Sequence, residues 1–121
     1  MEGMNTNNIM DINRILDEAR ELGCSDLHFT AGLPPVVRLH GSIRKLSGYP
    51  DCTEPIIVNI INQITSIKHK SQISKGLDTD FSYVSTAGFR HRVNVYRQRG
   101  YHAVAIRPVS YTHLTLPTNR E

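Results

Sequence analysis

One stretch decides the fold of this chain, Cys24-Ser25-Asp26-Leu27-His28-Phe29-Thr30-Ala31-Gly32-Leu33-Pro34-Pro35-Val36-Val37-Arg38-Leu39-His40-Gly41-Ser42-Ile43-Arg44. Its apolar and polar side chains alternate, with Leu27 and Phe29 on one face and their neighbours on the other, which is the period of a β-strand. A glycine and two prolines then interrupt the strand, because proline fixes its own φ angle and lacks an amide donor. The alternation resumes at Val37, and Gly41-Ser42 supplies a tight turn before a strand at 43–46 runs back. The stretch therefore predicts antiparallel strands that fold back on one another.

Amphipathic helices are predicted on both sides of this stretch. Apolar side chains recur at helical spacing over 12–22, Asp11 is a good N-cap, and Gly23 tolerates the positive φ that ends a helix. Six isoleucines form a second helical stripe from Ile56 to Ile67, and Thr53 can cap its first turn. Isoleucine favours strands, but the helical pattern persists over about three turns, so we predict a helix here.

The later part of the chain predicts an antiparallel meander. A short helical turn at 71–75 comes first, and strands at 80–84, 89–98 and 101–107 follow, separated by turns that contain glycine. In the long strand, His91 and the apolar side chains share one face, whereas arginines and other polar side chains share the opposite face. We therefore expect an α+β fold, in which helices pack on one face of an antiparallel sheet.

Length and composition limit the classes of protein that are possible. The chain has 121 residues, of which 39% are hydrophobic and 21% charged, and these values predict a single domain with a modest core. No apolar run is long enough to span a membrane, the 2 cysteines are too few for a disulfide framework, and the 6 histidines lack metal-ligand spacing. The net charge is +3, and most basic residues follow position 37, which indicates an anionic partner.

Four short motifs resemble one protein family. They are Ser25–Pro35, Arg38–Gly41, Asp78–Ser82 and Phe89–Val95, and they occur in that order within residues 10–107. This part of the chain resembles the N-terminal part of PilT-like type IV pilus retraction ATPases, which are a branch of the secretion-ATPase superfamily. Family members usually have Asp-Gly where this chain has His40-Gly41, a small departure within a turn.

The resemblance implies a fold and a function. The fold would be the PAS-like N-terminal domain of the family, and the intact protein would be a cytoplasmic homohexameric motor that disassembles type IV pili with ATP and magnesium. Its partners would be its own C-terminal ATPase domain, neighbouring subunits and the pilus machinery at the inner membrane, with peripheral attachment there as an option and no nucleic acid. The chain has no Gly-x-x-x-x-Gly-Lys-Ser/Thr loop, so we expect that alone it binds no cofactor and hydrolyses no ATP.

Arginines on adjacent predicted strands form the candidate site. Each guanidinium is a planar fork of donors that suits phosphate oxygens and remains charged at any relevant pH. From the residues alone, surface ion pairs with Asp78, with Asp80 or with a neighbouring subunit are the simpler interpretation. The resemblance implies that Arg92 and Arg107, and after them Arg99, contact the phosphates of a nucleotide held by the ATPase domain, in the manner of arginine fingers.

Other interpretations stay open at this point. A pilus-assembly or type II secretion ATPase would share most of these motifs, and a freestanding basic module would bind nucleic acid with a strong dependence on salt. Asp26 and His28 form a carboxylate–imidazole pair on one strand face. We prefer a structural role for this pair over a catalytic one, with Asp26 accepting hydrogen bonds from backbone amides near the start of the strand.

The two ends of the chain are expected to lie outside the domain at 11–108. Residues 1–10 are polar and show no periodicity, which predicts a disordered N-terminus. Residues 109–121 resemble a sequencing adapter translated in frame, so we interpret them as a non-native tail. A genuine divergent tail is the alternative.

Overall fold

The computed structural model describes residues 10–109. Its helices and strands follow one another in the order α2 (Ile12–Leu22), β1 (Asp26–Phe29), β2 (Val36–Leu39), β3 (Ser42–Lys45), α3 (Glu54–Ile64), α4 (Ile67–Ser74), β4 (Thr79–Val84), β5 (Arg90–Gln98) and β6 (Tyr101–Pro108). Residues 1–9 and 110–121 lie outside the described residues, so the disordered N-terminus and the non-native tail remain predictions. Met10, which we assigned to the N-terminal segment, is 5% exposed and belongs to the core.

The strands form one six-stranded antiparallel sheet in the order β3-β2-β1-β6-β5-β4. Each half of the sheet is a meander of three consecutive strands. The pairing of β1 with β6 joins the two halves, with Leu27 opposite Ile106. The α+β class and the antiparallel sheet predicted from the sequence are confirmed.

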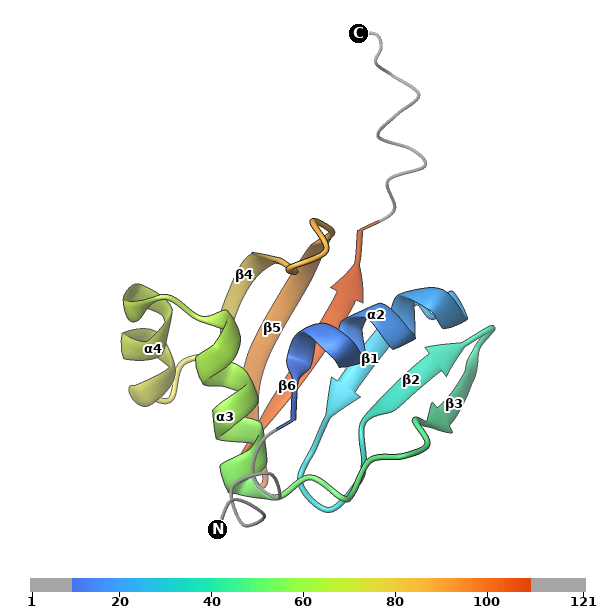
Figure 1. The fold of residues 1–121 in the computed structure, drawn as a ribbon. Coiled ribbons are helices and arrows are strands. Elements are labelled where there is room, and N and C mark those ends of the chain that lie inside the picture. Colours follow the sequence, from blue (N-terminus) through green and yellow to red (C-terminus); the bar gives the residue numbers. More distant parts are fainter. Residues whose placement is uncertain (1–9, 110–121) are drawn as a thin grey trace, which may run out of the picture.

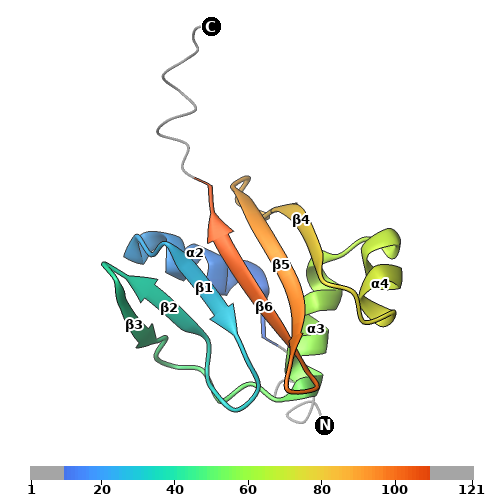
Figure 2. The same ribbon diagram turned by 180° about the vertical axis from the view of Figure 1, so that it is seen from behind.

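Helices cover one face of the sheet and leave the other face open. Figure 1 shows α2 and α3 in front of the strands, with α4 at the edge beside β4. Seen from behind, the strands are uncovered (Figure 2). The asymmetry follows the sequence alternation, because Leu27 and Phe29 are 0% exposed whereas Arg92 and Arg107 are exposed. We call the uncovered side the open face.

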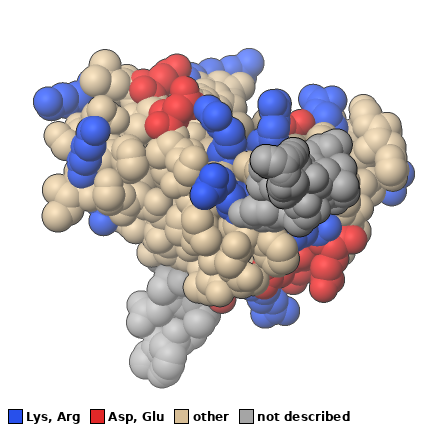
Figure 3. Space-filling view, turned by 90° about the horizontal axis from the view of Figure 1, so that it is seen from above, with Lys and Arg blue, Asp and Glu red and all other residues tan. Residues whose placement is uncertain are grey.

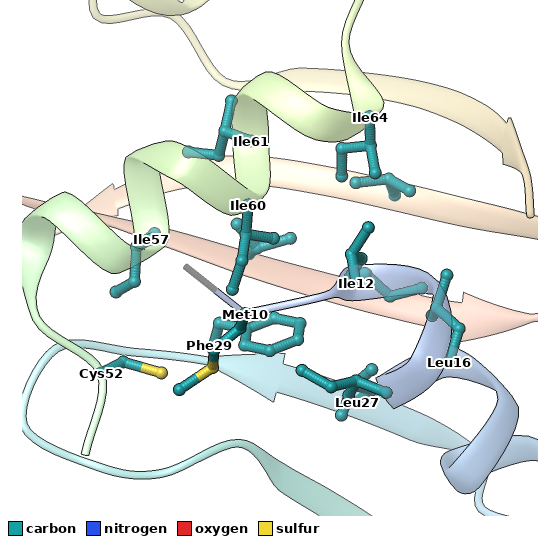
Figure 4. Packing of buried hydrophobic residues seen from close by; sticks show 14 of the residues in the cluster. Met10, Ile12, Leu16, Leu27, Phe29, Cys52, Ile57, Ile60, Ile61 and Ile64 are labelled. Atoms are coloured by element: carbon teal, nitrogen blue, oxygen red, sulfur yellow. The ribbon is translucent and has the colours of Figure 1, made fainter. Parts of the chain in front are cut away.

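The hydrophobic core lies between the helices and the covered face of the sheet. Phe29 of β1, Ile12 of α2, and Ile57 and Ile60 of α3 are each 0% exposed and belong to one cluster (Figure 4). Complete burial of a side chain of this size contributes roughly 1.5–3 kcal/mol relative to leaving it exposed. Burial of the isoleucine stripe therefore outweighs the weak preference of isoleucine for strands.

Side-chain hydrogen bonds fix α2 to α3 and to the sheet. On α3, Gln63 Nε2 donates to the carbonyl oxygen of Met10 at 2.7 Å, and Gln63 Oε1 accepts from the amide of Ile12 at 3.2 Å. On α2, Asn13 Oδ1 accepts from the hydroxyl of Tyr83 on β4 at 3.1 Å. These bonds satisfy polar groups beside the core and set the position of α2 across the sheet.

The second predicted helix is in fact two helices. The α3 helix ends at Ile64, because Thr65 is extended with φ −110° and ψ 149°. Ser66 then caps α4, accepting from the amide of His69 through its side chain. The predicted continuation of the helix to Ile67 is therefore wrong. The helical turn predicted at 71–75 is the last part of α4, which begins earlier, at Ile67. Ile67 is 86% exposed and does not extend the buried stripe.

The caps of α2 are confirmed, but the turn before β3 is shifted by one residue. Asp11 accepts hydrogen bonds from the first-turn amides of α2, and Gly23 ends the helix with φ 77°. The turn is formed by His40 and Gly41, at φ 53° and 83°, and not by Gly41-Ser42 as predicted. Two successive residues with positive φ are typical of the hairpin turn whose twist matches that of the strands.

Candidate functional site

A row of charged side chains crosses the open face of the sheet. Asp26 on β1 is the register partner of Arg38 on β2, and Arg92 on β5 is the register partner of Arg107 on β6. The register between β1 and β6 places Asp26 beside Arg107. Residues directly opposite one another in antiparallel strands project from the same face. The order across the sheet is therefore Arg38, Asp26, Arg107 and Arg92.

Asp26 binds two of these arginines. Arg107 Nε donates to Asp26 Oδ1 at 3.2 Å, and Arg38 Nε lies 3.4 Å from Asp26 Oδ2. The hydroxyl of Ser25 donates to the same carboxylate at 3.2 Å. The side chain of Asp26 is 18% exposed, whereas those of Arg38 and Arg107 are 45% and 74% exposed. The carboxylate is thus largely buried, whereas the two arginines that bind it extend into solvent.

Arg92 and Arg107 line a hollow of about 190 Å³ on the open face. Asp80 and Asn94 also line it, and Asn94 Nδ2 donates to Asp80 Oδ1 at 2.7 Å. Among residues 10–109, Arg92 has no carboxylate within 4.0 Å of its guanidinium. In the same range, neither arginine pairs with Asp78 or Asp80, and Asp80 is bound by an amide. A surface ion pair is nevertheless observed for Arg107, with Asp26 as the partner.

The structure does not bring Arg99 to this hollow. Arg99 and Gly100 form the turn between β5 and β6, with φ 55° and 83°. At roughly 3.3 Å per residue, Arg99 lies about 20 Å along the hairpin from Arg92. It lines a separate hollow of about 400 Å³ together with Leu33 and Tyr101. The sequence-predicted residues thus fall into a pair, Arg92 with Arg107, and one distant residue.

Basic and acidic side chains are both present at the end of the molecule where β6 finishes. Figure 3 shows Lys and Arg side chains spread over this face, with the acidic side chains mostly in separate groups. The chain as a whole carries a formal net charge of +3. Such a surface attracts anions over a range of about 10 Å at 0.1 M ionic strength. The wider charge distribution therefore acts in the same direction as the arginine pair.

The other reactive side chains hold structural positions. Asp26 binds arginines and not the backbone amides that we predicted, and no nucleophile is paired with His28 among the described residues. Burial raises the pKa of the Cys24 thiol, and burial beside Asp51 raises that of Cys52 to about 11. Thiols of this kind are poor nucleophiles at neutral pH.

Within residues 10–109, no three metal-ligating side chains cluster together. In the same range, the helices are too short or too polar to cross a bilayer.

Sequence reasoning placed Arg92 and Arg107 on adjacent strands, as observed, but missed the ion pair between Asp26 and Arg107. The hydrogen bond between Asp26 and Arg107 joins residues that are 81 positions apart. A local pattern contains no information on such a contact, because it depends on which strands become neighbours. The available signal was limited to the position of Asp26 on the polar side of an alternating strand.

Comparisons with known proteins agree with the fold and with the sequence motifs. No family model matches the chain. The chain is 36% identical over 96 residues to the type IV pilus retraction ATPase PilT of Pseudomonas aeruginosa, a match that covers 78% of this chain and 28% of that protein. A crystal structure of the pilus retraction motor PilT with bound ADP has a TM-score of 0.77 and 36% identity, and the match covers 84% of this chain and 29% of that one. The chain thus spans less than a third of the length of these relatives.

More distant relatives share the fold. The ATPase DotB of Legionella pneumophila has a TM-score of 0.71 at 22% identity, over 93% of this chain and 36% of its own. DotB of Yersinia pseudotuberculosis has a TM-score of 0.67 at 16% identity, over 82% of this chain and 29% of its own. The fold and the sequence identity to PilT define the class, that of the N-terminal domains of secretion ATPases.

Within that class the chain is a PilT-like N-terminal domain. This narrower assignment depends on the 36% identity to PilT, which is matched in both the sequence and the structure comparison.

Proposed function

We propose that this chain works as the N-terminal domain of a type IV pilus retraction ATPase, in which Arg92 and Arg107 contact the phosphates of a nucleotide held by a separate ATPase domain. The observation that carries the proposal is the register between β5 and β6, which sets these two arginines side by side on the open face. The similarity to PilT, whose crystal structure contains ADP, supports it.

The chemistry of the two arginines suits this role. Phosphoryl transfer depends largely on positioning and on the stabilisation of negative charge around the γ-phosphate. A guanidinium remains protonated and can bind two phosphate oxygens at once. Because the Arg107 side chain is 74% exposed, it can reach an anion that lies outside the domain. The nucleotide and its magnesium would be held by the ATPase domain, and this domain would contribute positive charge.

The proposal extends to the assembly in which the domain works. The intact protein would be a cytoplasmic homohexamer acting on the pilus machinery at the inner membrane. Among residues 10–109, no helix lies over the open face (Figure 2), which is the surface that would meet the ATPase domain or a neighbouring subunit. Contacts there would bring Arg92 and Arg107 to a nucleotide only when the domains close on each other, which would couple ATP hydrolysis to movement.

Arg99 has a different place in the proposal. At about 20 Å from Arg92 along the hairpin, it is too distant to bind the same phosphate group. A phosphate contact by Arg99 would therefore be made to a second nucleotide, at another subunit boundary. Its hollow, which is shared with Leu33 and Tyr101, would lie at that boundary.

Steady-state ATP hydrolysis by the intact protein tests the arginine pair. Replacing Arg92 or Arg107 with alanine is expected to lower kcat at least tenfold, because each variant loses a positive charge that stabilises the transition state. Arg44→Ala is the matched control, since Arg44 is an exposed arginine on the edge strand β3, away from the hollow. An unchanged kcat in both Arg92→Ala and Arg107→Ala would overturn the phosphate contact.

A further inference from the structure

We propose that Asp26 is a positioning residue for this phosphate contact: it fixes the guanidinium of Arg107 in the orientation that receives the anion. The inference rests on the proposed function and adds a residue to it. Arg92 and Arg107 are neighbours on the sheet, yet their surroundings differ. Arg107 is held by Asp26, whereas Arg92 has no carboxylate within 4.0 Å among residues 10–109.

The carboxylate is the fixed member of the pair. Asp26 is the first residue of β1, a strand flanked by neighbours on both sides, and its side chain is 18% exposed. Three groups contact it: the hydroxyl of Ser25 at 3.2 Å, Arg38 Nε at 3.4 Å and Arg107 Nε at 3.2 Å. Held from three directions, the carboxylate can act as an anchor for the far more exposed Arg107.

The contact through Nε leaves the end of the guanidinium available. Arginine has five N–H donors in a planar fork, and the bond to Asp26 uses the one on Nε. Within residues 10–109 the terminal nitrogens of Arg107 make no hydrogen bond, and the side chain lines the hollow and is 74% exposed. Asp26 therefore orients Arg107 without occupying the donors that suit two phosphate oxygens.

An arginine side chain that is already oriented binds an anion more favourably than a free one. A free arginine side chain loses much of its rotamer freedom when it binds an anion, whereas one already held by a carboxylate has lost part of that freedom beforehand. The negative charge of Asp26 acts in the opposite direction, because it repels the anion. A matched variant that removes an equal charge from the same hollow separates the two effects, and Asp80 provides it. Asp80 lines the hollow but is bound by Asn94 and not by an arginine.

The experiment uses the 121-residue chain and tripolyphosphate as the probe at low salt. Asp26→Ala and Asp80→Ala each remove one negative charge. We expect tripolyphosphate to bind Asp26→Ala about threefold to tenfold more weakly than Asp80→Ala, because only the first variant releases Arg107. Equal or tighter binding by Asp26→Ala would overturn the positioning role. No binding by the wild-type chain would also overturn this inference, whereas the phosphate contact itself is overturned only by an unchanged kcat in the arginine variants of the intact protein, so the two failures are distinguishable.

A second measurement reports on Arg107 without any anion. Side-chain NMR relaxation at arginine Nε should show an ordered Arg107 and a more mobile Arg92 in the wild-type chain. In Asp26→Ala the order at Arg107 should fall to that of Arg92, while in Asp80→Ala it should be unchanged. Asp26→Asn, which keeps the shape of the side chain if the alanine variant does not fold, should give intermediate order. An Arg107 as mobile in the wild type as in Asp26→Ala would contradict the proposal.

Discussion

The two faces of the sheet use the same strands for different purposes. On the covered face, Leu27 and Phe29 of β1 are 0% exposed and Ile106 of β6 is 1% exposed. On the open face, the adjoining positions of the same strands hold Asp26 and Arg107, which form an ion pair whose arginine is largely exposed. One residue along a strand thus separates a side chain that stabilises the fold from one that can bind a ligand.

This contrast indicates which positions of the domain can be substituted without unfolding it. Burial of apolar side chains supplies most of the stability of a folded domain, and exposed ion pairs contribute about 0–1 kcal/mol each. The covered face therefore fixes the fold, while the open face leaves its arginines available to an anion. If this is correct, substitutions on the two faces should differ in which property they alter.

The largest expected effect is on the covered face. Phe29→Ala should lower the free energy of unfolding by about 3–5 kcal/mol, because it removes a large, fully buried side chain and leaves a cavity. His28→Ala, one residue away on the open face, should cost less than about 1 kcal/mol. Urea denaturation of both variants measures the difference. Similar losses of unfolding free energy in the two variants would contradict the assignment of His28 to the open face.

A smaller effect is expected from His91, a fully buried histidine on the covered face. His91 is 1% exposed, and within residues 10–109 its Nε2 has no hydrogen-bond partner. Burial lowers the pKa of His91 below its usual value of 6.5; nearby Arg20 acts in the same direction, while the Tyr83 and Phe89 backbone and Asp17 oppose it. As the pH falls through 6.5, the unfolded chain takes up a proton that the folded chain does not. Stability should therefore fall with pH in this window and level off below the folded-state pKa.

Replacement of His91 should remove this part of the pH dependence. His91→Phe keeps a ring of similar shape and cannot titrate, so the difference in unfolding free energy between pH 7.5 and pH 5.5 should become smaller. The other histidines are unchanged in His91→Phe, so the comparison isolates the contribution of His91. If the pH dependence is the same in His91→Phe and in the wild type, His91 is not the group that titrates.

Local patterns predicted most elements of both faces, but not the contacts between distant strands. The alternation around Phe29 placed the covered and open faces of β1 correctly, and Thr53 caps α3 as its position before the isoleucine stripe indicated. The end of α3 was missed because Ile67 fits the helical period while the extended backbone at Thr65 interrupts it. The link between Asp26 and Arg107 was missed because it depends on the pairing of β1 with β6, which only the assembled sheet determines.

Substitutions in the β2–β3 turn and in the β5–β6 turn should increase the stability of the domain. His40 and Arg99 each adopt positive φ, at 53° and 55°, which is disfavoured for residues other than glycine, asparagine and aspartate. His40→Asn and Arg99→Asn should each raise the free energy of unfolding by about 1 kcal/mol. Thermal unfolding of the variants tests this. If Arg99 makes a contact at a subunit boundary, Arg99→Asn should in addition weaken assembly of the intact protein, whereas His40→Asn should not.

The smallest effect on stability is expected at Arg92 itself. Arg92 is exposed and has no ion-pair partner among residues 10–109, so Arg92→Ala should change the free energy of unfolding by no more than about 0.5 kcal/mol. The same variant should weaken tripolyphosphate binding clearly, because it removes one of the two guanidiniums at the hollow. Arg44→Ala, a change of equal charge on the edge strand, should leave binding nearly unaltered. A loss of more than 1 kcal/mol in Arg92→Ala would show that Arg92 serves the fold, and the distinction between a covered face for stability and an open face for binding would then fail at its central residue.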